Sequence, residues 1–141
     1  MPKFQISQLE AGQHPDWCEI IRQGLYQHNR EQVGSRELAE LALVALNNDG
    51  QVIGGVLGGS IWGWMLIETF WVAKEMRGHG LGAALLAETE QIARQRGCGH
   101  VILETFSFQA LPFYQKFGYV IYGQLDDFPL GHSRFSLKKD F

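Results

Sequence analysis

In the first third of the chain, apolar and polar residues alternate first with the spacing of a strand and then with the spacing of a helix. Residues 3–9 are polar at alternate positions, which predicts a short first strand. Four apolar residues then recur at helical spacing: Trp17, Ile20, Ile21 and Leu25. They predict a helix with one core-facing side, which begins at residues 13–16 with Pro15 near its first position. Residues 34–37 predict a second short helical segment or turn.

Strand-like runs dominate the middle of the chain. Residues 41–46 and 51–57 flank the strong turn signal NNDG at 47–50, which predicts an antiparallel hairpin. Glycines at positions 58, 59 and 63 separate this hairpin from a long apolar strand over residues 62–73. The three strands are predicted to form a meander.

Helices and strands alternate in the second half of the chain. The predicted elements are a helix over residues 81–96 that Gly97 ends, a buried strand over 100–104, a short helix over 109–116, and two strands over 119–124 and 134–138. Pro112 is compatible with the short helix if it lies in the first turn. This order predicts one α/β domain over residues 1–141, with a mixed, mostly antiparallel sheet of six to seven strands and helices on both faces.

Composition and charge narrow the classes of function. The 141 residues are 45% hydrophobic and 19% charged, as in a globular protein. The net charge of −3 argues against generic binding to nucleic acids or anionic membranes and is compatible with a cationic substrate. The N-terminus lacks the apolar segment of a signal peptide, and no apolar run is long enough to span a bilayer, so we expect a cytoplasmic protein.

Cysteines and histidines give no sign of a metal site. Cys18 and Cys98 lie far apart and form no metal or redox motif, so two reduced thiols are expected. The five histidines have no ligand spacing such as HExxH. We therefore expect that the protein binds no metal.

The stretch from Trp71 to Ala84 has the features of an anion-binding turn. The first amides of a helix have no intrahelical acceptor, and the helix dipole adds partial positive charge at the same place. Gly78, Gly80 and Gly82 are predicted to let the backbone turn through positive φ and approach phosphate oxygens, with Arg77 as a fixed charge beside them. The same pattern also fits an ordinary glycine-rich turn before a core helix.

Two nucleotide-binding motifs compete for this turn. A Walker loop is excluded because the Lys-Ser/Thr pair is absent. A dinucleotide-binding fingerprint is a near match, since residues 78–83 read GxGxxA and Glu104 closes the next strand. However, residues 74–77 separate the first glycine from the preceding strand, and too few elements follow Glu104 to build further βαβ units.

Two motifs in the right order resemble those of the GNAT superfamily of acyl-CoA-dependent N-acetyltransferases. Residues 77–82, RGHGLG, resemble the signature R/Q-x-x-G-x-G/A of that family. Residues 110–119, ALPFYQKFGY, are similar to its segment A-x-x-x-Y-x-K-x-G-F/Y, and a predicted helix and strand lie between the two motifs. The order of elements matches over essentially the whole chain, although the first third matches only in outline.

The resemblance implies acetyl-CoA as cosubstrate and assigns residues to it. Backbone amides from Arg77 through Gly78, His79, Gly80 and Leu81 to Gly82 would hold the pyrophosphate. Main-chain groups near Trp71, Val72 and Ala73 would pair with the pantetheine arm, which enters a gap where the parallel strands 62–73 and 100–104 splay apart. One departure is Ser107, which stands where the family often has asparagine, so a pantetheine contact from that side chain is not expected. Similar proteins are often homodimers.

Two residues are candidates for acid-base chemistry. Attack on a thioester needs a neutral amine, so a base is useful at neutral pH. On a regularly alternating strand Glu68 shares a face with Trp64, Leu66, Phe70 and Val72, and desolvation there would raise its pKa. Tyr114 is the candidate acid for the departing thiolate, and the resemblance places the family's usual catalytic tyrosine at this position. The alternatives to these catalytic roles are that Glu68 is a structural carboxylate paired with an arginine or lysine, and that Tyr114 only packs, with its hydroxyl in solvent.

Other residues have weaker signals. A backbone N–H near Val72 is a candidate oxyanion donor. Trp62, Trp64 and Trp71 are expected to pack in the core and strands, with one of them a candidate wall of an acceptor pocket. Solvated carboxylates are expected at Glu104, Asp126 and Asp127, which are also candidates for attracting a cationic amine.

The predicted function is direct transfer of an acetyl group from acetyl-CoA to a primary amine of a small molecule or peptide. No residue in the sequence separates a small-molecule acceptor from a protein acceptor. The alternatives are a non-catalytic CoA-binding or sensing module and a dinucleotide-binding protein. The expected partners are acetyl-CoA, an amine and a second copy of the chain.

Overall fold

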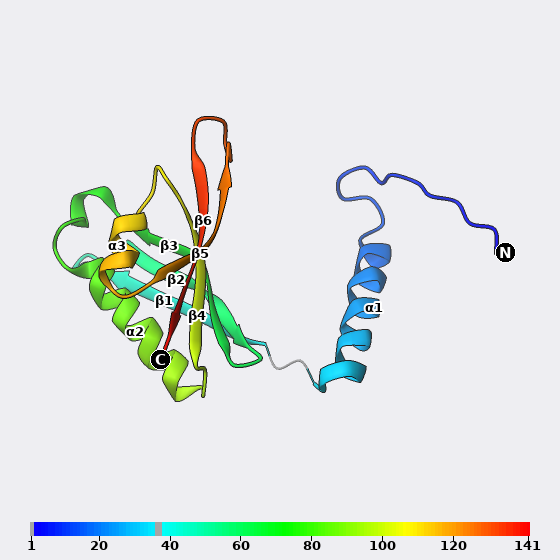
Figure 1. Cartoon of the computed structure of the whole chain (residues 1–141), viewed down its shortest axis with the longest axis horizontal. Coiled ribbons are helices and arrows are strands. Elements are labelled where there is room, and N and C mark those ends of the chain that lie inside the picture. The colour runs from blue at the N-terminus through cyan, green and yellow to red at the C-terminus, as the bar shows by residue number, and fades with distance from the viewer. Residues whose placement is uncertain (1, 36–37) are drawn as a thin grey trace. The chain divides into compact units, whose positions relative to one another are not determined.

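The computed structural model describes residues 2–35 and 38–141, which belong to two units, one up to residue 36 and one from residue 37 onward (Figure 1). The predicted helical segment or turn at residues 34–37 involves Arg36 and Glu37, which lie outside the described residues. A single domain over residues 1–141 therefore stays a prediction.

The smaller unit contains α1 (Pro15–Val33), which begins at Pro15 as predicted. None of its residues is buried, and Trp17, Ile20 and Ile21 are 49%, 67% and 71% exposed, so nothing covers the predicted core-facing side within this unit. The prediction of a strand over residues 3–9 is wrong, because this segment has no extended neighbour within its unit to pair with and is irregular.

The larger unit is built on one six-stranded sheet in the order β1-β2-β3-β4-β6-β5 (Figure 1). The strands are β1 (Ala39–Leu46), β2 (Val52–Ile61), β3 (Trp64–Val72), β4 (His100–Phe106), β5 (Val120–Asp126) and β6 (Ser133–Asp140). Neighbouring strands are antiparallel except β3 and β4, which are parallel. The predicted mixed, mostly antiparallel α/β fold is confirmed.

The turn between β2 and β3 lies later than predicted. Trp62 and Gly63 form a two-residue hairpin turn with φ of 51° and 81°, whereas residues 58–60 belong to β2. Gly58 is needed there because a Cβ would overlap the carbonyl oxygen of Leu66 on β3. The glycines therefore allow close strand approach and do not mark a loop.

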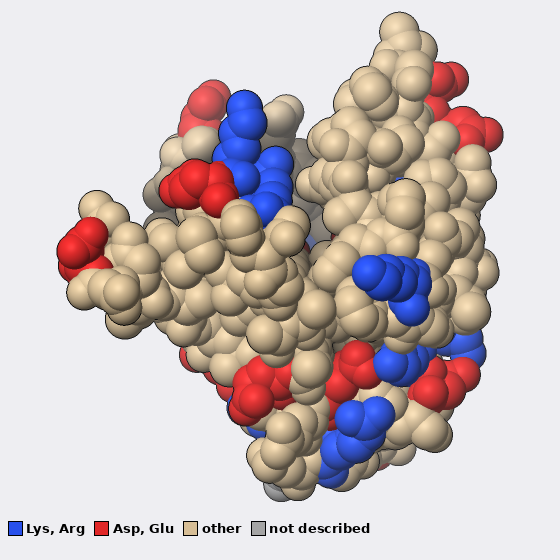
Figure 2. All heavy atoms as spheres, turned by 90° about the vertical axis from the view of Figure 1, so that its left-hand side faces the viewer, with Lys and Arg blue, Asp and Glu red and all other residues tan. Residues whose placement is uncertain are grey.

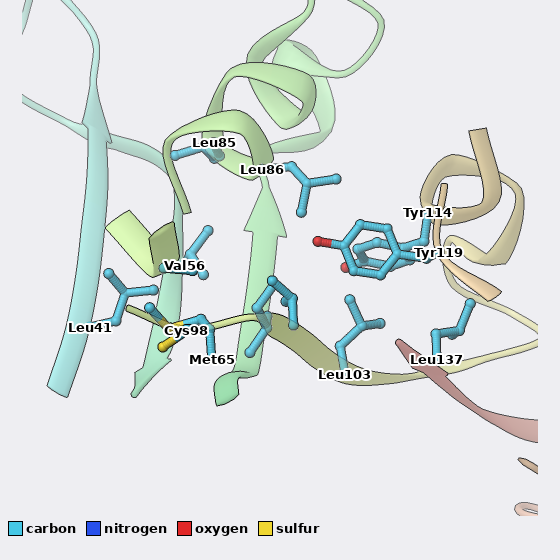
Figure 3. Packing of buried hydrophobic residues seen from close by; sticks show 13 residues of the cluster. Leu41, Val56, Met65, Leu85, Leu86, Cys98, Leu103, Tyr114, Tyr119 and Leu137 are labelled. Atoms are coloured by element: carbon cyan, nitrogen blue, oxygen red, sulfur yellow. The ribbon is translucent and has the colours of Figure 1, made fainter. Parts of the chain in front are cut away.

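Helices α2 (Leu81–Gln95) and α3 (Leu111–Lys116) cover one face of this sheet. Figure 3 shows the core that they share with the strands, in which Met65, Leu86 and Leu137 are almost fully buried. Gly97 ends α2 as predicted, with φ of 76° and the Cys98 N–H bonded to the Ala93 carbonyl. Within residues 2–35 and 38–141 we find no helix of the length and apolarity that a bilayer crossing requires. A helix on the other face of the sheet stays a prediction.

The parallel strands β3 and β4 pair over only part of their length. Pairing runs from Trp64 opposite His100 to Ile67 opposite Leu103 and then stops. Beyond this point β3 stays with β2 and β4 stays with β6. The two parallel strands therefore splay apart in the middle of the sheet, as the family resemblance implies.

Candidate active site

A cleft of about 1140 Å³ opens where β3 and β4 splay apart. Its walls come from β3, the 76–83 turn, β4, α3 and the start of β6. Figure 2 views the larger unit from the side of α2 and α3 and shows its surface hollowed between two raised parts. The volume exceeds that of typical small-ligand pockets, so the cleft has room for an elongated ligand and a second molecule.

The predicted anion cradle lies at one end of this cleft. A short 3-10 turn, η1 (Lys74–Met76), leads from β3 to Gly78 and Gly80, which have φ of 79° and 86°. Because the first intrahelical bond of α2 runs from the Ala84 N–H to the Gly80 carbonyl, the three amides before Ala84 have no acceptor within the helix. Arg77 donates from Nε to the Val72 carbonyl (3.1 Å), which ties the turn to β3.

Gly82 has a different part in this turn from the one predicted. It lies in the first turn of α2 with helical backbone, so it does not need positive φ. A Cβ at Gly82 would lie 3.3 Å from the Phe113 ring, so its small size lets α3 pack against α2. Of the other predicted residues, His79 has an exposed side chain, and Leu81 packs against the core and offers only its main-chain groups to an anion.

Main-chain groups at the end of β3 alternate between β2 and the cleft. The Ala73 N–H donates to the Ile53 carbonyl of β2 (2.8 Å) and is therefore engaged. Strand alternation then turns the N–H groups of Phe70 and Val72 toward the cleft, where β4 no longer pairs with β3. Of the predicted main-chain contacts, Val72 alone has its N–H on the cleft side, while Trp71 contributes its half-exposed side chain to the wall.

Glu68 occupies a bulge in β3. The register with β2 shifts between Leu57 and Gly58, which leaves Glu68 without a partner. The bulge breaks the alternation, so Phe70 and Val72 lie on the core side with Met65 and do not share a face with Trp64 and Leu66. The predicted apolar surroundings of Glu68 are therefore wrong, and its side chain is exposed on the cleft wall.

Tyr114 reaches the cleft from α3. Pro112 lies in the first turn of α3, as predicted. The Tyr114 ring is 6% exposed and packs edge-on against Phe70 and Phe113, at 5.9 and 5.1 Å between ring centroids. Burial raises the pKa of Tyr114 to about 12, so the phenol keeps its proton at neutral pH. Figure 3 shows Tyr114 beside Tyr119 on the side of the core next to Leu86.

An ion pair on the β4 side of the cleft was not predicted. Glu104 was expected to be solvated, but its Oε2 pairs with the Arg134 guanidinium across β4 and β6. Both residues line the cleft, together with Phe106 and Phe108. Because Arg134 is far from Glu104 in sequence and the pairing depends on strand register, no local pattern points to it.

Ser107 and Asp126 hydrogen-bond to Ser133 at the start of β6 and do not line the cleft. Ser107 Oγ accepts the Ser133 N–H (3.0 Å) and lies 3.4 Å from His132 Nδ1. Asp126 accepts hydrogen bonds from Gln124 and Ser133, which lower its pKa. Asp127, in the same loop, accepts the Gly131 N–H.

Groups that bind metals are scattered in the part of the chain that the structure describes. Residues 2–35 and 38–141 hold no cluster of three or more His, Cys, Asp or Glu side chains. Cys18 and Cys98 are free thiols. Among the tryptophans, Trp64 stacks on His100 at 4.1 Å, and Trp62 lies exposed in the β2–β3 turn.

Comparison with known proteins identifies the family. The model of the acetyltransferase (GNAT) family matches residues 5–119. The chain belongs to this family. An acetyltransferase of Agrobacterium fabrum is 33% identical over 123 residues, which cover 87% of this chain and 90% of that protein. The blasticidin-S acetyltransferase of Streptomyces morookaense is 36% identical over 107 residues, with 75% and 79% covered.

Solved structures agree with the GNAT assignment. An acetyltransferase from Bacillus cereus is 35% identical with a TM-score of 0.86, over 96% of this chain and 98% of that one. An acetyltransferase from Bacillus anthracis, solved in complex with acetyl coenzyme A, is 26% identical with a TM-score of 0.65, over 74% and 64%. The protein is thus a GNAT acetyltransferase, and the dinucleotide-binding alternative is wrong.

Proposed function

We propose that this GNAT enzyme moves the acetyl group of acetyl-CoA directly onto a primary amine of a small molecule. The observation that carries the proposal is that one cleft joins the 77–82 turn to the Tyr114 phenol. A cofactor with an anionic end and a reactive thioester end fits a site that offers free amides at one end and a proton donor farther along.

Two parts of the cleft suit CoA. The unpaired amides at the start of α2, with Arg77 beside them, would hold the pyrophosphate. The cleft-facing main chain of β3 at Val72 would hydrogen-bond the pantetheine arm in the gap between β3 and β4. Once bound, the thioester supplies an activated acetyl group, and the chain supplies the groups that orient it.

Each candidate group has one step in the transfer. Glu68 accepts the proton of the ammonium, directly or through water, and the freed amine attacks the thioester carbon. The Phe70 N–H, which faces the cleft next to that of Val72, polarises the carbonyl as the C–N bond forms and the C–S bond breaks. Tyr114 gives its proton to the departing sulfur. The attacking nitrogen loses its second proton through water, which restores the phenol, and Glu68 passes the first proton on to solvent. The products are the N-acetylated amine and CoA as free thiol.

The acceptor class has support from a relative. Blasticidin-S acetyltransferase, by its name, acts on a small molecule. A negative carboxylate at Glu68 favours an acceptor whose free amine is an ammonium in solution. We also propose that residues 1–141 form one domain and that the enzyme acts in the cytoplasm as a homodimer.

An acetyl-CoA-dependent screen over small amines and peptides tests this function. We expect release of free thiol only when a primary amine of a small molecule is present, and loss of release in Gly80→Asp because CoA binding fails. Tight acetyl-CoA binding by calorimetry with no product from any amine would contradict the proposal and favour the non-catalytic module. Acetylation of peptides alone would exclude the small-molecule acceptor.

A further inference from the structure

One wall of the cleft has no part in the proposed acetyl transfer. Val101, Leu103 and Thr105 of β4 are buried in the core, so Glu104 and Phe106 point to the opposite face of the sheet. Arg134 on β6 lies directly across from Phe106, on the same face. These residues therefore line the cleft on the face of the sheet opposite to α2, α3 and the Tyr114 ring.

Three phenylalanines form a layered aromatic wall with this arginine. The Phe106 ring stacks on Phe108 (5.2 Å, 13°) and on Phe128 (5.7 Å, 27°). The Arg134 guanidinium lies 5.0 Å from the Phe128 centroid and 5.8 Å from that of Phe106. Phe108 is 54% exposed and lines the cleft, so one face of a planar ligand can stack on it.

Arg134 has more donors than the protein uses. A guanidinium offers five N–H donors. Its NH2 pairs with Glu104, while Nε is buried and has no hydrogen-bond partner within the described residues. Leaving a charged donor unpaired is costly, so a ligand oxygen that accepts from this guanidinium, with a small shift of the side chain, would be favoured.

The charges at this end of the cleft restrict the ligand. Arg134 neutralises Glu104, and Glu68 on β3 adds one negative charge, while the other two charged lining residues, Arg77 and Lys116, belong to the glycine turn and to α3. This balance favours a cationic amine on a neutral body and disfavours a second negative group on the acceptor.

We propose that the acceptor is a primary amine carried on a neutral aromatic or heteroaromatic ring with a carbonyl oxygen. The ring stacks on Phe108, and the oxygen accepts a hydrogen bond from Arg134. This inference rests on the proposed function and adds the class of substrate to it. Phe108 and Arg134 then determine specificity and take no part in the chemistry.

Four matched amines test separately the stacking on Phe108 and the hydrogen bond from Arg134. They are 4-(aminomethyl)benzamide, benzylamine, 4-(aminomethyl)cyclohexanecarboxamide and cyclohexylmethylamine, which combine a planar or saturated ring with or without a carbonyl. We expect the benzamide to have a kcat/KM about tenfold above each compound that lacks one feature. 4-(Aminomethyl)benzoate should be acetylated less well than the benzamide, because it adds a negative charge.

Two variants test the residues. Phe108→Leu should remove the advantage of the planar ring and keep that of the carbonyl. Arg134→Lys should do the reverse, because it keeps the ion pair with Glu104 but loses the planar fork of donors. Phe141→Leu, at an exposed ring beyond the end of β6, is the control and should change neither preference.

Binding measurements keep this inference separate from the proposed function. The four amines are titrated into the CoA-bound enzyme by calorimetry, in parallel with the assay. The expected order of affinities without any product would support the ring and carbonyl subsite and overturn the proposed function. Turnover of aliphatic polyamines with equal and weak binding of all four compounds would keep the proposed function and overturn the subsite.

Discussion

The ring of Tyr114 lies edge-on against the ring of Tyr119, with centroids 5.9 Å apart and planes 70° apart. Tyr119 is 2% exposed, and its hydroxyl points to Glu90, which Lys139 holds at 2.6 Å. The candidate acid is thus packed against a buried polar cluster that joins α2 to β6. This contact fixes the Tyr114 ring and does not involve its hydroxyl.

Tyr114→Phe removes the proton donor and keeps the packing. We expect kcat to fall about a hundredfold with little change in the KM for acetyl-CoA, because the ring contacts with Phe70 and Phe113 are retained. Thiol release measures both constants. Tyr122→Phe, at an exposed tyrosine of β5, should match the wild type. Unchanged kcat in Tyr114→Phe would remove this residue from the mechanism.

Glu68→Gln tests the base. Since the neutral amide cannot accept the ammonium proton, kcat should fall about a hundredfold and rise again at higher pH, where more acceptor is unprotonated. Glu88→Gln, an exposed carboxylate on α2, is the matched control. If the substitution left both kcat and its pH profile unchanged, Glu68 would have no part in proton removal.

Gly80→Asp tests the cradle. Gly80 has φ of 86°, and the aspartate adds a negative charge and a side chain where the pyrophosphate is proposed to bind. We expect CoA affinity to fall at least about tenfold by calorimetry. Gly50→Asp in the β1–β2 turn, with φ of 77°, imposes a similar backbone strain and should leave affinity unchanged. Equal affinity in Gly80→Asp and the wild type would reject the cradle.

Alkaline pH should destabilise the fold through the buried phenols. Burial raises the pKa of Tyr114 from 10.0 to about 12, and burial, followed by the Glu90 carboxylate, raises the pKa of Tyr119 further. The stability that their protonated forms contribute is complete below pH 10 and is lost as pH rises through the folded-state values. We expect the free energy of unfolding by urea to fall above pH 10, and to fall less steeply in Tyr119→Phe. Equal pH dependence in both proteins would contradict this account.

Removing only the cation of the Glu90–Lys139 ion pair should destabilise the fold more than replacing both charged residues with neutral ones. Glu90 is 6% exposed, so Lys139→Met leaves a nearly buried carboxylate without its cation and should destabilise by about 3 kcal/mol. The double variant Glu90→Gln with Lys139→Met should recover most of that loss. Chemical denaturation measures both, and a double variant no more stable than Lys139→Met would show that the pair is not coupled.

The sequence predicted the order of strands and helices after residue 40 because those segments carry strong periodic patterns. It also led to the glycine turn and to Tyr114, since both lie in motifs of contiguous residues. The strand predicted at residues 3–9 was wrong because alternation alone does not supply a partner strand. The role of Gly82 was missed because its neighbour Phe113 comes from a distant helix.

The surroundings of Glu68 and the Arg134 wall depend on strand register. A one-residue bulge at Glu68 reverses which side chains of β3 face the core after it, and no composition signal marks that bulge. Likewise, Glu104 meets Arg134 only because β6 inserts beside β4 out of chain order. These parts of the cleft required the three-dimensional arrangement.

Mass spectrometry of the amine after incubation with enzyme and acetyl-CoA tests the central proposal most directly. We expect that 4-(aminomethyl)benzamide gains a single acetyl group on its primary amine, that wild-type enzyme forms this product far faster than Tyr114→Phe, and that Gly80→Asp forms almost none. If no amine of a broad panel is acetylated although acetyl-CoA binds tightly to the wild type, the proposed acetyl transfer is contradicted.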